Sequence, residues 1–245
     1  MEAVDGMAEF DKVAKIYDEW VSQSVGDESF YLDLAKNARG RVLEVGCGTG
    51  RIYLPMLKSG VDAYGFDISS KMLVKLKEKA AKEGLTPKVF RADMRNFRAG
   101  KKFKLIIVPF LSFTHLPVSE DQLAALKTIR AHLAPNGKFA LDFFCPSSEF
   151  ISKNYGKWVK EKVRNTTGRT FSYYSDEVNQ TVTSLREISA GGKKYSTKNQ
   201  FTLIYKKEFE LLLRLAGFSK WKVYGGFKRE PLNSVRQKMV WIVEK

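Results

Sequence analysis

A short apolar segment runs into alternating glycines near residue 45. Residues 42–50 read VLEVGCGTG, which predicts a strand over residues 41–46, a tight turn and a helix over residues 50–59. Glycine reaches turn conformations that a Cβ disfavours and lets a ligand approach the backbone closely. The first turn of the following helix would also offer unpaired N–H groups. The segment therefore predicts a binding site for a small molecule.

The glycine spacing and a nearby acid indicate which kind of molecule binds there. The glycines stand at positions 46, 48 and 50, and Arg51 follows; a dinucleotide fingerprint would have its third glycine at that following position. Glu44 precedes the first glycine, and its carboxylate would repel a pyrophosphate but attract an amino group or a sulfonium. A cationic nucleoside cofactor is therefore favoured, and a nicotinamide-dependent oxidoreductase is a distant alternative.

Two further acids follow expected strands. Asp67 closes a strand expected over residues 61–67, where a carboxylate can accept hydrogen bonds from both ribose hydroxyls. Asp93 follows a strand expected over residues 88–92 and can accept from the amino group of an adenine. Because the carboxyl ends of neighbouring parallel strands line one crevice, Glu44, Asp67 and Asp93 are expected to converge on one ligand.

Strands and helices alternate through the first 145 residues. After the glycine turn we expect a helix over residues 69–83 with Ser69 as N-cap, a strand over 103–108, a helix over 120–133 and a strand over 138–144. Five strands that alternate with helices predict a doubly wound α/β sheet.

The segments that flank this core show other patterns. Aromatic and apolar residues at helical spacing predict one amphipathic helix over residues 7–22, and a second helix is expected over 28–38. Residues 157–205 predict antiparallel strands with turns at 167–168 and 191–192. A helix over 206–216 and a strand pair over 218–224 and 238–243 close the chain.

These residues resemble the class I S-adenosylmethionine-dependent methyltransferase family over about residues 1–145 and 200–245. Residues 44–50 match its first motif, Asp67 its ribose acid and Asp93 its adenine acid. The resemblance implies a Rossmann-like, seven-stranded sheet whose last strand is antiparallel, with an antiparallel β insertion after strand 5. Within the family the chain is most similar to small-molecule enzymes such as sugar-amine N,N-dimethyltransferases and glycine N-methyltransferase-like proteins.

The resemblance also implies a domain organisation, a cofactor and a set of site residues. Residues 1–245 would form one domain, with a core over 36–145 and 200–245, a helical cap over 1–35 and a lid over 146–199. The cofactor would be S-adenosylmethionine, with S-adenosylhomocysteine as product. The expected cofactor-binding residues are Tyr17, Glu44, Gly46, Cys47, Gly48, Thr49, Gly50, Arg51, Asp67, Ile68, Ala92, Asp93, Met94, Phe110 and Leu111.

Methyl transfer from a sulfonium is an in-line displacement that mainly requires alignment of donor and acceptor. A base helps when the acceptor arrives protonated, and His115, after the fourth strand, is the best candidate. Tyr17 is the second, through its hydroxyl or by presenting its ring to the sulfonium. Each also has a structural interpretation, with His115 packed in a turn and Tyr17 in a helix core.

The main hypothesis is methyl transfer to a small-molecule N or O acceptor. The net charge of +15 is concentrated in residues 151–245, with 20 Lys and Arg against 8 Asp and Glu. An RNA or protein methyltransferase that uses this basic region is one alternative, and binding to nucleic acid would weaken steeply with salt. A non-catalytic S-adenosylmethionine-binding module is another.

Other features bear on metals, location and partners. Two cysteines, Cys47 and Cys145, and two histidines give no metal-ligand pattern, so no metal site is expected. The apolar stretches are too short to span a bilayer, and the protein is expected in the cytoplasm as a monomer or homodimer. Aromatic residues concentrate in residues 146–200, where they are expected to cover the crevice and form the acceptor pocket.

Overall fold

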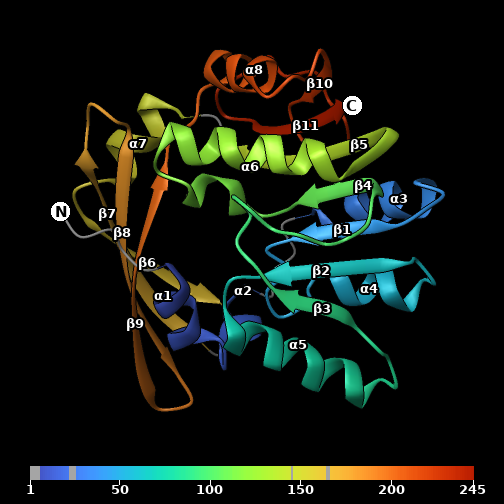
Figure 1. Ribbon diagram of the computed structural model, residues 1–245. Coiled ribbons are helices and arrows are strands. Elements are labelled where there is room, and N and C mark those ends of the chain that lie inside the picture. The colour runs from blue at the N-terminus through green and yellow to red at the C-terminus, as the bar shows by residue number, and fades with distance from the viewer. Residues whose placement is uncertain (1–5, 22–25, 145, 164–165) are drawn as a thin grey trace.

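The structure, a computed structural model, describes residues 6–21, 26–144, 146–163 and 166–245. Its larger sheet has seven strands in the order β10-β11-β5-β4-β1-β2-β3 (Figure 1). They are β1 Val42–Val45, β2 Ala63–Asp67, β3 Lys88–Arg91, β4 Phe103–Val108, β5 Leu133–Phe144, β10 Lys220–Tyr224 and β11 Lys238–Glu244. The first five are parallel, and β11 is antiparallel to its neighbours β5 and β10. The predicted doubly wound sheet with an antiparallel last strand is confirmed.

Helices cover both faces of this sheet because its strands are apolar on both sides. Leu43 and Val45 of β1 pack in the cluster that contains α6 Ser119–His132 and α8 Lys206–Leu215. Val42 packs on the other face with α3 Glu28–Asn37, α4 Tyr53–Lys58 and α5 Ser70–Lys82. Ser69 caps α5 as predicted, since its hydroxyl accepts a hydrogen bond from the Met72 backbone N–H.

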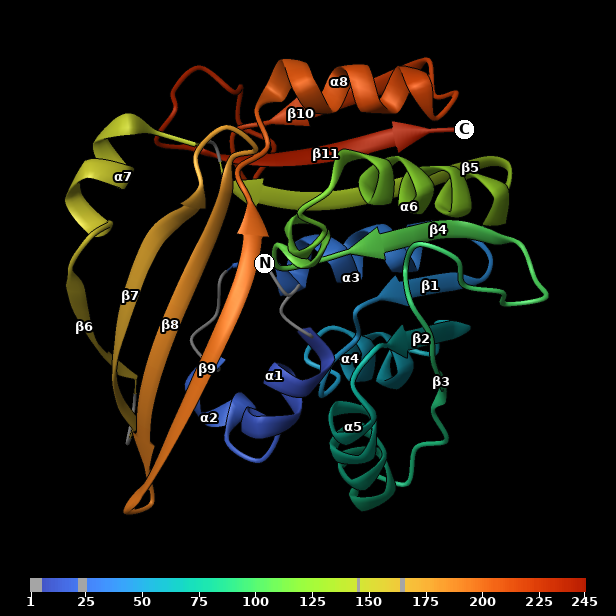
Figure 2. The same ribbon diagram turned by 60° about the vertical axis from the view of Figure 1, so that its left-hand side comes forward.

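A smaller antiparallel sheet lies between β5 and α8 in the sequence. It has the order β6-β7-β8-β9, with β6 Trp158–Val163, β7 Thr166–Asp176, β8 Thr181–Ala190 and β9 Lys193–Thr202, and α7 Ser148–Asn154 precedes it. Figures 1 and 2 show this sheet standing across the carboxyl ends of the parallel strands. The predicted antiparallel insertion after the fifth strand is confirmed.

The N-terminal segment lies between the smaller sheet and α5 (Figure 2). The single helix expected over residues 7–22 is wrong: the segment forms α1 Gly6–Val13 and α2 Tyr17–Val21 with a turn between them. The two helices are tied to different elements. Asp11 accepts hydrogen bonds at the start of α5, whereas Asp18 accepts from Thr49 in the glycine turn. A change of direction between Asp11 and Asp18 lets each reach its partner.

One of the two expected turns of the insertion is also wrong. Residues 167–168 lie within β7, not in a turn. A Cβ on Gly168 would lie 2.8 Å from the Glu187 carbonyl oxygen of the neighbouring strand, so this glycine serves close strand approach. The turn at Gly191 and Gly192 is confirmed, and both residues have positive φ.

The fifth strand begins earlier than predicted. Leu133 already pairs with Phe103, and the register then shifts so that Leu105 pairs with Lys138. The intervening residues, among them Asn136 with a φ of 56°, form the irregularity that the sequence suggests as a loop. In the part of the chain that the structure describes, no helix is long and apolar enough to cross a membrane.

Candidate functional site

The glycine turn between β1 and α4 is held in a conformation open to a ligand. Gly46, Gly48 and Gly50 have φ values of 69°, 52° and 89°, which side chains with a Cβ rarely adopt. A Cβ on Gly50 would meet Leu54 at 2.9 Å, so this glycine is needed for packing. A Cβ on Gly48 would meet nothing within 4 Å. The backbone at Gly48 is therefore accessible to a bound molecule.

Contacts with β2 fix the turn. The Cys47 backbone N–H donates to the Phe66 carbonyl oxygen at 2.9 Å, and the Cys47 side chain is buried against Gly65. The Gly48 N–H donates to Asp67 Oδ2 and the Ser69 N–H to Asp67 Oδ1, both at 2.8 Å. Burial raises the pKa of Asp67, although these two N–H groups oppose the shift. Asp67 therefore holds the turn, and its carboxylate retains acceptor capacity for a ligand.

Apolar surface lies beside this acid. Ile68 follows Asp67, and 37% of its side chain is exposed, which is unusual for a residue between a buried strand and its helix. Ala92 and Met94 follow β3 and are partly buried against the core. These three residues can flank a nucleoside.

Glu44 provides a test of whether the site fits a cationic ligand. Its side chain is 3% exposed, and its Oε2 atom has no hydrogen-bond partner among the described residues. Burial raises the pKa of this carboxyl well above its usual range, although the Arg51 guanidinium opposes the shift. A buried acceptor without a donor is costly. An amino group that donates to Glu44 would relieve that cost, so the residues fit S-adenosylmethionine.

Arg51 joins three parts of the site. Its guanidinium binds both Asp27 carboxylate oxygens, at 2.6 Å and 2.7 Å, and lies 5.1 Å from the centre of the Phe110 ring. Asp27 stands at the start of α3 and is fully buried. This ion pair places the glycine turn, α3 and the segment after β4 relative to one another.

The segment after β4 holds a strained pair. Phe110 and Leu111 have φ values of 56° and 63°, and such values in residues other than glycine often mark functional sites. The Phe110 N–H donates to buried Asp142 at 2.9 Å, and Asp142 also accepts from the Tyr31 hydroxyl at 2.7 Å. Lys238 binds its second oxygen at 3.2 Å. Asp142 thus holds the pair expected to flank the adenine.

The Asp93 carboxylate already forms an ion pair with Arg95. Arg95 binds both of its carboxylate oxygens, the shortest contact being 2.6 Å, and also binds Asp121 at 2.9 Å. Burial alone would raise the pKa of Asp93, but the hydrogen bonds from Arg95 outweigh it and lower the pKa. Asp93 is therefore an ionised acceptor, and its proposed contact with adenine would be shared with Arg95.

The N-terminal helices close over this edge of the sheet. Asp18 accepts from the Thr49 hydroxyl and forms an ion pair with Lys79 at 2.9 Å. The adjacent Tyr17 packs edge-on to Trp20, with ring centres 6.2 Å apart. Burial raises the pKa of Tyr17 to about 12. Tyr17 is therefore a neutral phenol, which suits hydrogen bonding or ring contact and not proton abstraction.

His115 lies where the short helix η1 Ser112–His115 meets β9. Its Nδ1 atom is 3.0 Å from the Gln200 carbonyl oxygen, and because a carbonyl only accepts, Nδ1 carries the proton. Burial lowers the pKa of His115. The ring is therefore neutral near pH 7, with Nε2 available as a base. His132, by contrast, uses Nδ1 towards Thr128 and Nε2 towards Ala99.

The aromatic residues of the insertion divide between its two faces. Tyr195 packs against the same buried cluster as Tyr17 and Trp20, beside α1 and α2. Phe171 points to the opposite face, where it contacts Trp158 with ring centres 5.5 Å apart. Phe171 and Trp158 therefore lie on the face away from α1 and α2, and coverage of the crevice by the other aromatics stays a prediction. Cys145 lies outside the described residues.

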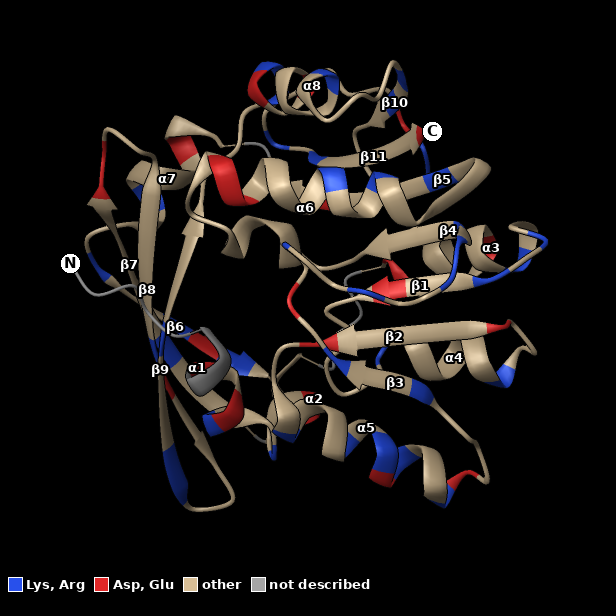
Figure 3. Ribbon diagram, viewed as in Figure 1, with Lys and Arg blue, Asp and Glu red and all other residues tan. Residues whose placement is uncertain are grey.

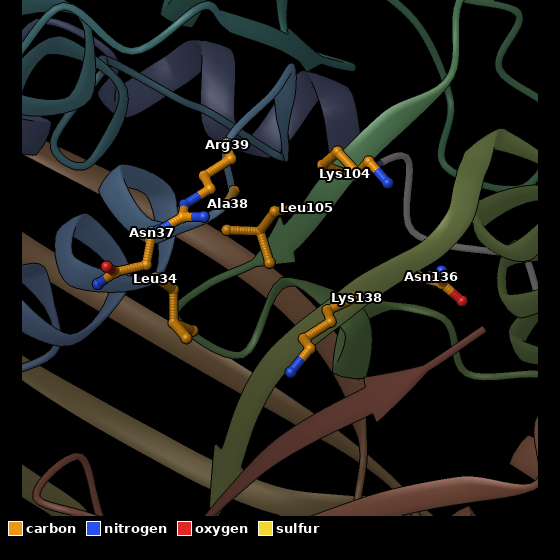
Figure 4. Close-up of a pocket in the computed structure, with 8 residues that line it drawn as sticks. All are labelled: Leu34, Asn37, Ala38, Arg39, Lys104, Leu105, Asn136 and Lys138. Carbon is orange, nitrogen blue, oxygen red and sulfur yellow. The ribbon is translucent and has the colours of Figure 1, made fainter.

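Two surface cavities lie at the other edge of the sheet, near the amino ends of its strands. One, of about 320 Å³, is lined by Leu34, Asn37, Ala38, Arg39, Lys104, Leu105, Asn136 and Lys138 (Figure 4). The other, of about 680 Å³, shares Arg39 and Lys104 and adds Lys36, Arg41 and Lys102. Figure 3 shows basic residues gathered at this edge, away from the glycine turn.

Comparison with known proteins identifies similar methyltransferases. Residues 42–137 match the family model described as a methyltransferase domain. The chain is 27% identical to dTDP-3-amino-3,4,6-trideoxy-alpha-D-glucopyranose N,N-dimethyltransferase of Streptomyces venezuelae, over 79% of this chain and 84% of that protein. It is 28% identical to a glycine/sarcosine N-methyltransferase of Halorhodospira halochloris, over 93% and 82%.

Solved structures show the same fold. The CcbJ methyltransferase of Streptomyces caelestis superposes with a TM-score of 0.85 at 24% identity, over 98% of both chains. An S-adenosylmethionine-dependent methyltransferase of Clostridium acetobutylicum gives 0.80 at 17% identity, over 96% of this chain and 98% of that one. The fold and the matched domain define a Rossmann-like methyltransferase. The chain is similar to the class I S-adenosylmethionine-dependent methyltransferases, and S-adenosylmethionine is its methyl donor.

The sequence interpretation missed several residues that build the site. Asp142 interrupts an apolar strand. A lone charge in a buried strand is a usable signal, because such groups are rarely buried without a partner or a role. Gln200 acts through its backbone carbonyl, which no sequence pattern reveals.

Proposed function

We propose that this enzyme transfers a methyl group from S-adenosylmethionine to an amine of a small-molecule acceptor held between the carboxyl ends of the parallel strands and the β insertion. The observation that carries the proposal is His115, a neutral imidazole whose Nδ1 proton is fixed by Gln200. Relatives named as sugar-amine and glycine/sarcosine N-methyltransferases support a nitrogen acceptor. An oxygen acceptor is the less favoured alternative.

In the proposed site, Glu44, Asp67 and Asp93 hold the amino group, ribose and adenine of the donor. The glycine turn at residues 46–50 and Arg51 surround the donor. The residues that flank its nucleoside are Ile68, Ala92, Met94, Phe110 and Leu111. When bound, S-adenosylmethionine supplies a methyl group on a sulfonium, which is activated for displacement.

Chain residues then align the acceptor and handle its proton. An amine in water is mostly protonated near pH 7 and must lose a proton before it can attack. His115 Nε2 accepts that proton, because its lowered pKa keeps it unprotonated. Tyr17 contacts the donor by its ring or hydroxyl. Burial under α1, α2 and the insertion excludes water from the reacting groups.

We further propose that residues 1–245 act as one domain, with a core over 36–145 and 200–245, a cap over 1–35 and a lid over 146–199. The proposed location is the cytoplasm, as a monomer or homodimer. An RNA or protein acceptor receives little support, since basic residues of the C-terminal region such as Arg169, Lys206 and Lys220 pair with carboxylates.

Calorimetric titration with S-adenosylmethionine, S-adenosylhomocysteine and NAD tests the donor site. Asp67→Asn should weaken both adenosyl ligands. Asp62→Asn should not, because Asp62 is exposed at the other end of the same strand, where it pairs with Lys88. Turnover of amines and their hydroxyl counterparts then tests the acceptor. Adenosyl binding with no turnover of any amine or alcohol would support the non-catalytic module instead.

A further inference from the structure

Arg186 is a cation on the inner face of the insertion. Its neighbours at alternate positions, Ile188 and Ala190, pack against Val13 and Ile16 next to α1. The Arg186 guanidinium carbon lies 4.2 Å from the centre of the Trp20 ring of α2. The side chain therefore points from β8 into the space between the insertion and the N-terminal helices, not towards solvent.

Arg186 has no carboxylate at salt-bridge distance within the described ranges. Its Nε–H donates to the Thr170 hydroxyl at 3.0 Å, and that hydroxyl donates in turn to Glu161 at 2.9 Å. Burial lowers the pKa of Arg186, although Glu161 opposes the shift through space. By contrast, Arg51 has a carboxylate bound at both nitrogens. A mostly buried guanidinium whose two outer nitrogens lack such a partner is poised for an anion.

Other polar groups continue this surface. Ser184 lies two residues before Arg186 on the same face of β8, and its hydroxyl is hydrogen-bonded to the Ser172 hydroxyl at 3.0 Å. Asn199 is opposite Ser184 in β9, and its Oδ1 atom is buried without a partner among the described residues. This polar strip, formed by Arg186, Ser184 and Asn199, therefore offers a cation and an unpaired acceptor at neighbouring positions on one face of the smaller sheet.

This polar strip lies beside the proposed chemistry. Arg186 lies over Trp20, whose ring centre is 6.2 Å from that of Tyr17. Asn199 precedes Gln200, whose carbonyl oxygen binds His115. Burial lowers the pKa of His115, and the charge of Arg186 adds to this shift. A molecule held by Arg186 is thus close to the proposed base and to the tyrosine expected over the donor.

We propose that Arg186 binds an oxyanion of the methyl acceptor, a carboxylate or a phosphate, and that Asn199 accepts a hydrogen bond from a donor on the same molecule. The planar guanidinium matches either oxyanion with two parallel hydrogen bonds. The enzyme would then select acceptors that carry both an amine and a negative charge. This inference rests on the proposed function, which places the acceptor on this face of the insertion.

The oxyanion site is measurable without turnover, because Trp20 reports on it. Acetate, inorganic phosphate and pyrophosphate are titrated into protein saturated with S-adenosylhomocysteine while tryptophan fluorescence is followed. A saturable change should appear in the wild type, vanish in Trp20→Phe, and weaken by about 10–100-fold in Arg186→Gln, the range for a hydrogen bond to a charged group. Differences among the three probes distinguish carboxylate from phosphate recognition.

Arg169→Gln is the matched control. Arg169 also lies over a tryptophan of this sheet, 4.3 Å from the Trp158 ring centre, but it is exposed and paired with Glu187. It should leave the titration unchanged. Oxyanion binding that persists in Arg186→Gln overturns the inference. So does weaker S-adenosylhomocysteine binding in Arg186→Gln, since the anion would then be the carboxylate of the donor.

A second measurement compares acceptors that differ only in charge, glycine with glycinamide and glucosamine 6-phosphate with glucosamine. The wild type should prefer one anionic member, and Arg186→Gln should reduce that preference in kcat/KM by about 10–100-fold. An equal loss for both members of each pair would contradict a role in charge recognition. A lack of turnover with every amine would count against the proposed function, and the fluorescence titration would still decide the oxyanion site.

Discussion

The two ends of the parallel strands differ in how their charged groups are paired. The end where the strands finish, next to the glycine turn, is called the carboxyl edge here, and the end where they begin is called the amino edge. At the carboxyl edge, Glu44 of β1 and Arg186 of the facing insertion are mostly buried. Among the described residues, Glu44 Oε2 has no hydrogen-bond partner, and Arg186 binds the Thr170 hydroxyl but no carboxylate. At the amino edge, Lys102 and Lys104 donate to backbone carbonyl oxygens, and Asp62 pairs with Arg41 and Lys88. The described cavities lie at the amino edge. Unsatisfied buried groups therefore indicate the site better here than hollow surface does.

Backbone strain follows the same division. The positive φ values of Phe110 and Leu111 are fixed by buried Asp142, next to the proposed adenine position. Arg39 and Asn136 at the amino edge also have positive φ, but both are exposed, Arg39 after the end of α3 and Asn136 in a strand irregularity. The carboxyl edge thus holds strain that neighbouring contacts enforce, as expected of a preorganised site.

The largest effect on activity is expected at His115. His115→Gln should lower kcat by about 10²–10⁴-fold, the usual range for loss of a general base. Because burial lowers the pKa of His115, kcat/KM of the wild type should fall with acid only below the ordinary histidine value, and the variant should lack this limb. His132→Gln is the control. Unchanged turnover in His115→Gln would exclude a base at this position.

A second large effect, on stability, is expected at Asp142. Asp142→Ala removes the acceptor for Tyr31, Phe110 and Lys238 and leaves a lysine without its buried partner. Breaking such a pair costs about 3–5 kcal/mol, so the free energy of unfolding in urea should fall by that amount. Asp62→Ala, which removes two exposed ion pairs, should cost at most about 1 kcal/mol. Equal losses would contradict the difference between the two edges.

Glu44 gives a smaller effect with a defined pH dependence. Its pKa in the folded protein is raised well above the usual value by burial, so it favours folding below the unfolded pKa of about 4.3. That contribution is lost as pH rises through the folded pKa. In the absence of ligand, the free energy of unfolding of Glu44→Gln should fall less as pH rises than that of the wild type. In a separate titration, the variant should bind S-adenosylhomocysteine about 10–100-fold more weakly. The control Glu120→Gln, at the exposed start of a helix, should change neither the pH dependence of stability nor the affinity for S-adenosylhomocysteine. If stability still fell with rising pH in Glu44→Gln, Glu44 would not be the group that titrates.

Much of the fold and of the donor site could be predicted from local patterns. The glycine turn, Asp67 and the capping Ser69 lie within one βα unit, so spacing along the chain determines their geometry. The acceptor side could not be predicted in this way. Arg186 meets Trp20 and His115 meets Gln200 only when β8, β9, α2 and η1 assemble, and these contacts join residues far apart in sequence.

Two errors in the prediction have the same origin. Gly168 resembles a turn residue, but the approach of a neighbouring strand requires it. The N-terminal helix is periodic throughout, yet Asp11 and Asp18 bind different elements and the helix breaks between them. In both cases a tertiary contact outweighs local propensity.

The smallest effect is expected at the amino edge. Arg39→Ala and Lys104→Ala remove the cations shared by both cavities. Within the described part of the chain, no hydrogen bond or ion pair joins either residue to the glycine turn or to the insertion. Each variant should keep kcat, KM and S-adenosylhomocysteine affinity within about twofold, as usual for surface substitutions. Steady-state kinetics and calorimetry measure this. A loss of turnover that reaches the His115→Gln level would mean that the amino edge takes part in the reaction, and the proposed assignment of function to the carboxyl edge would fail.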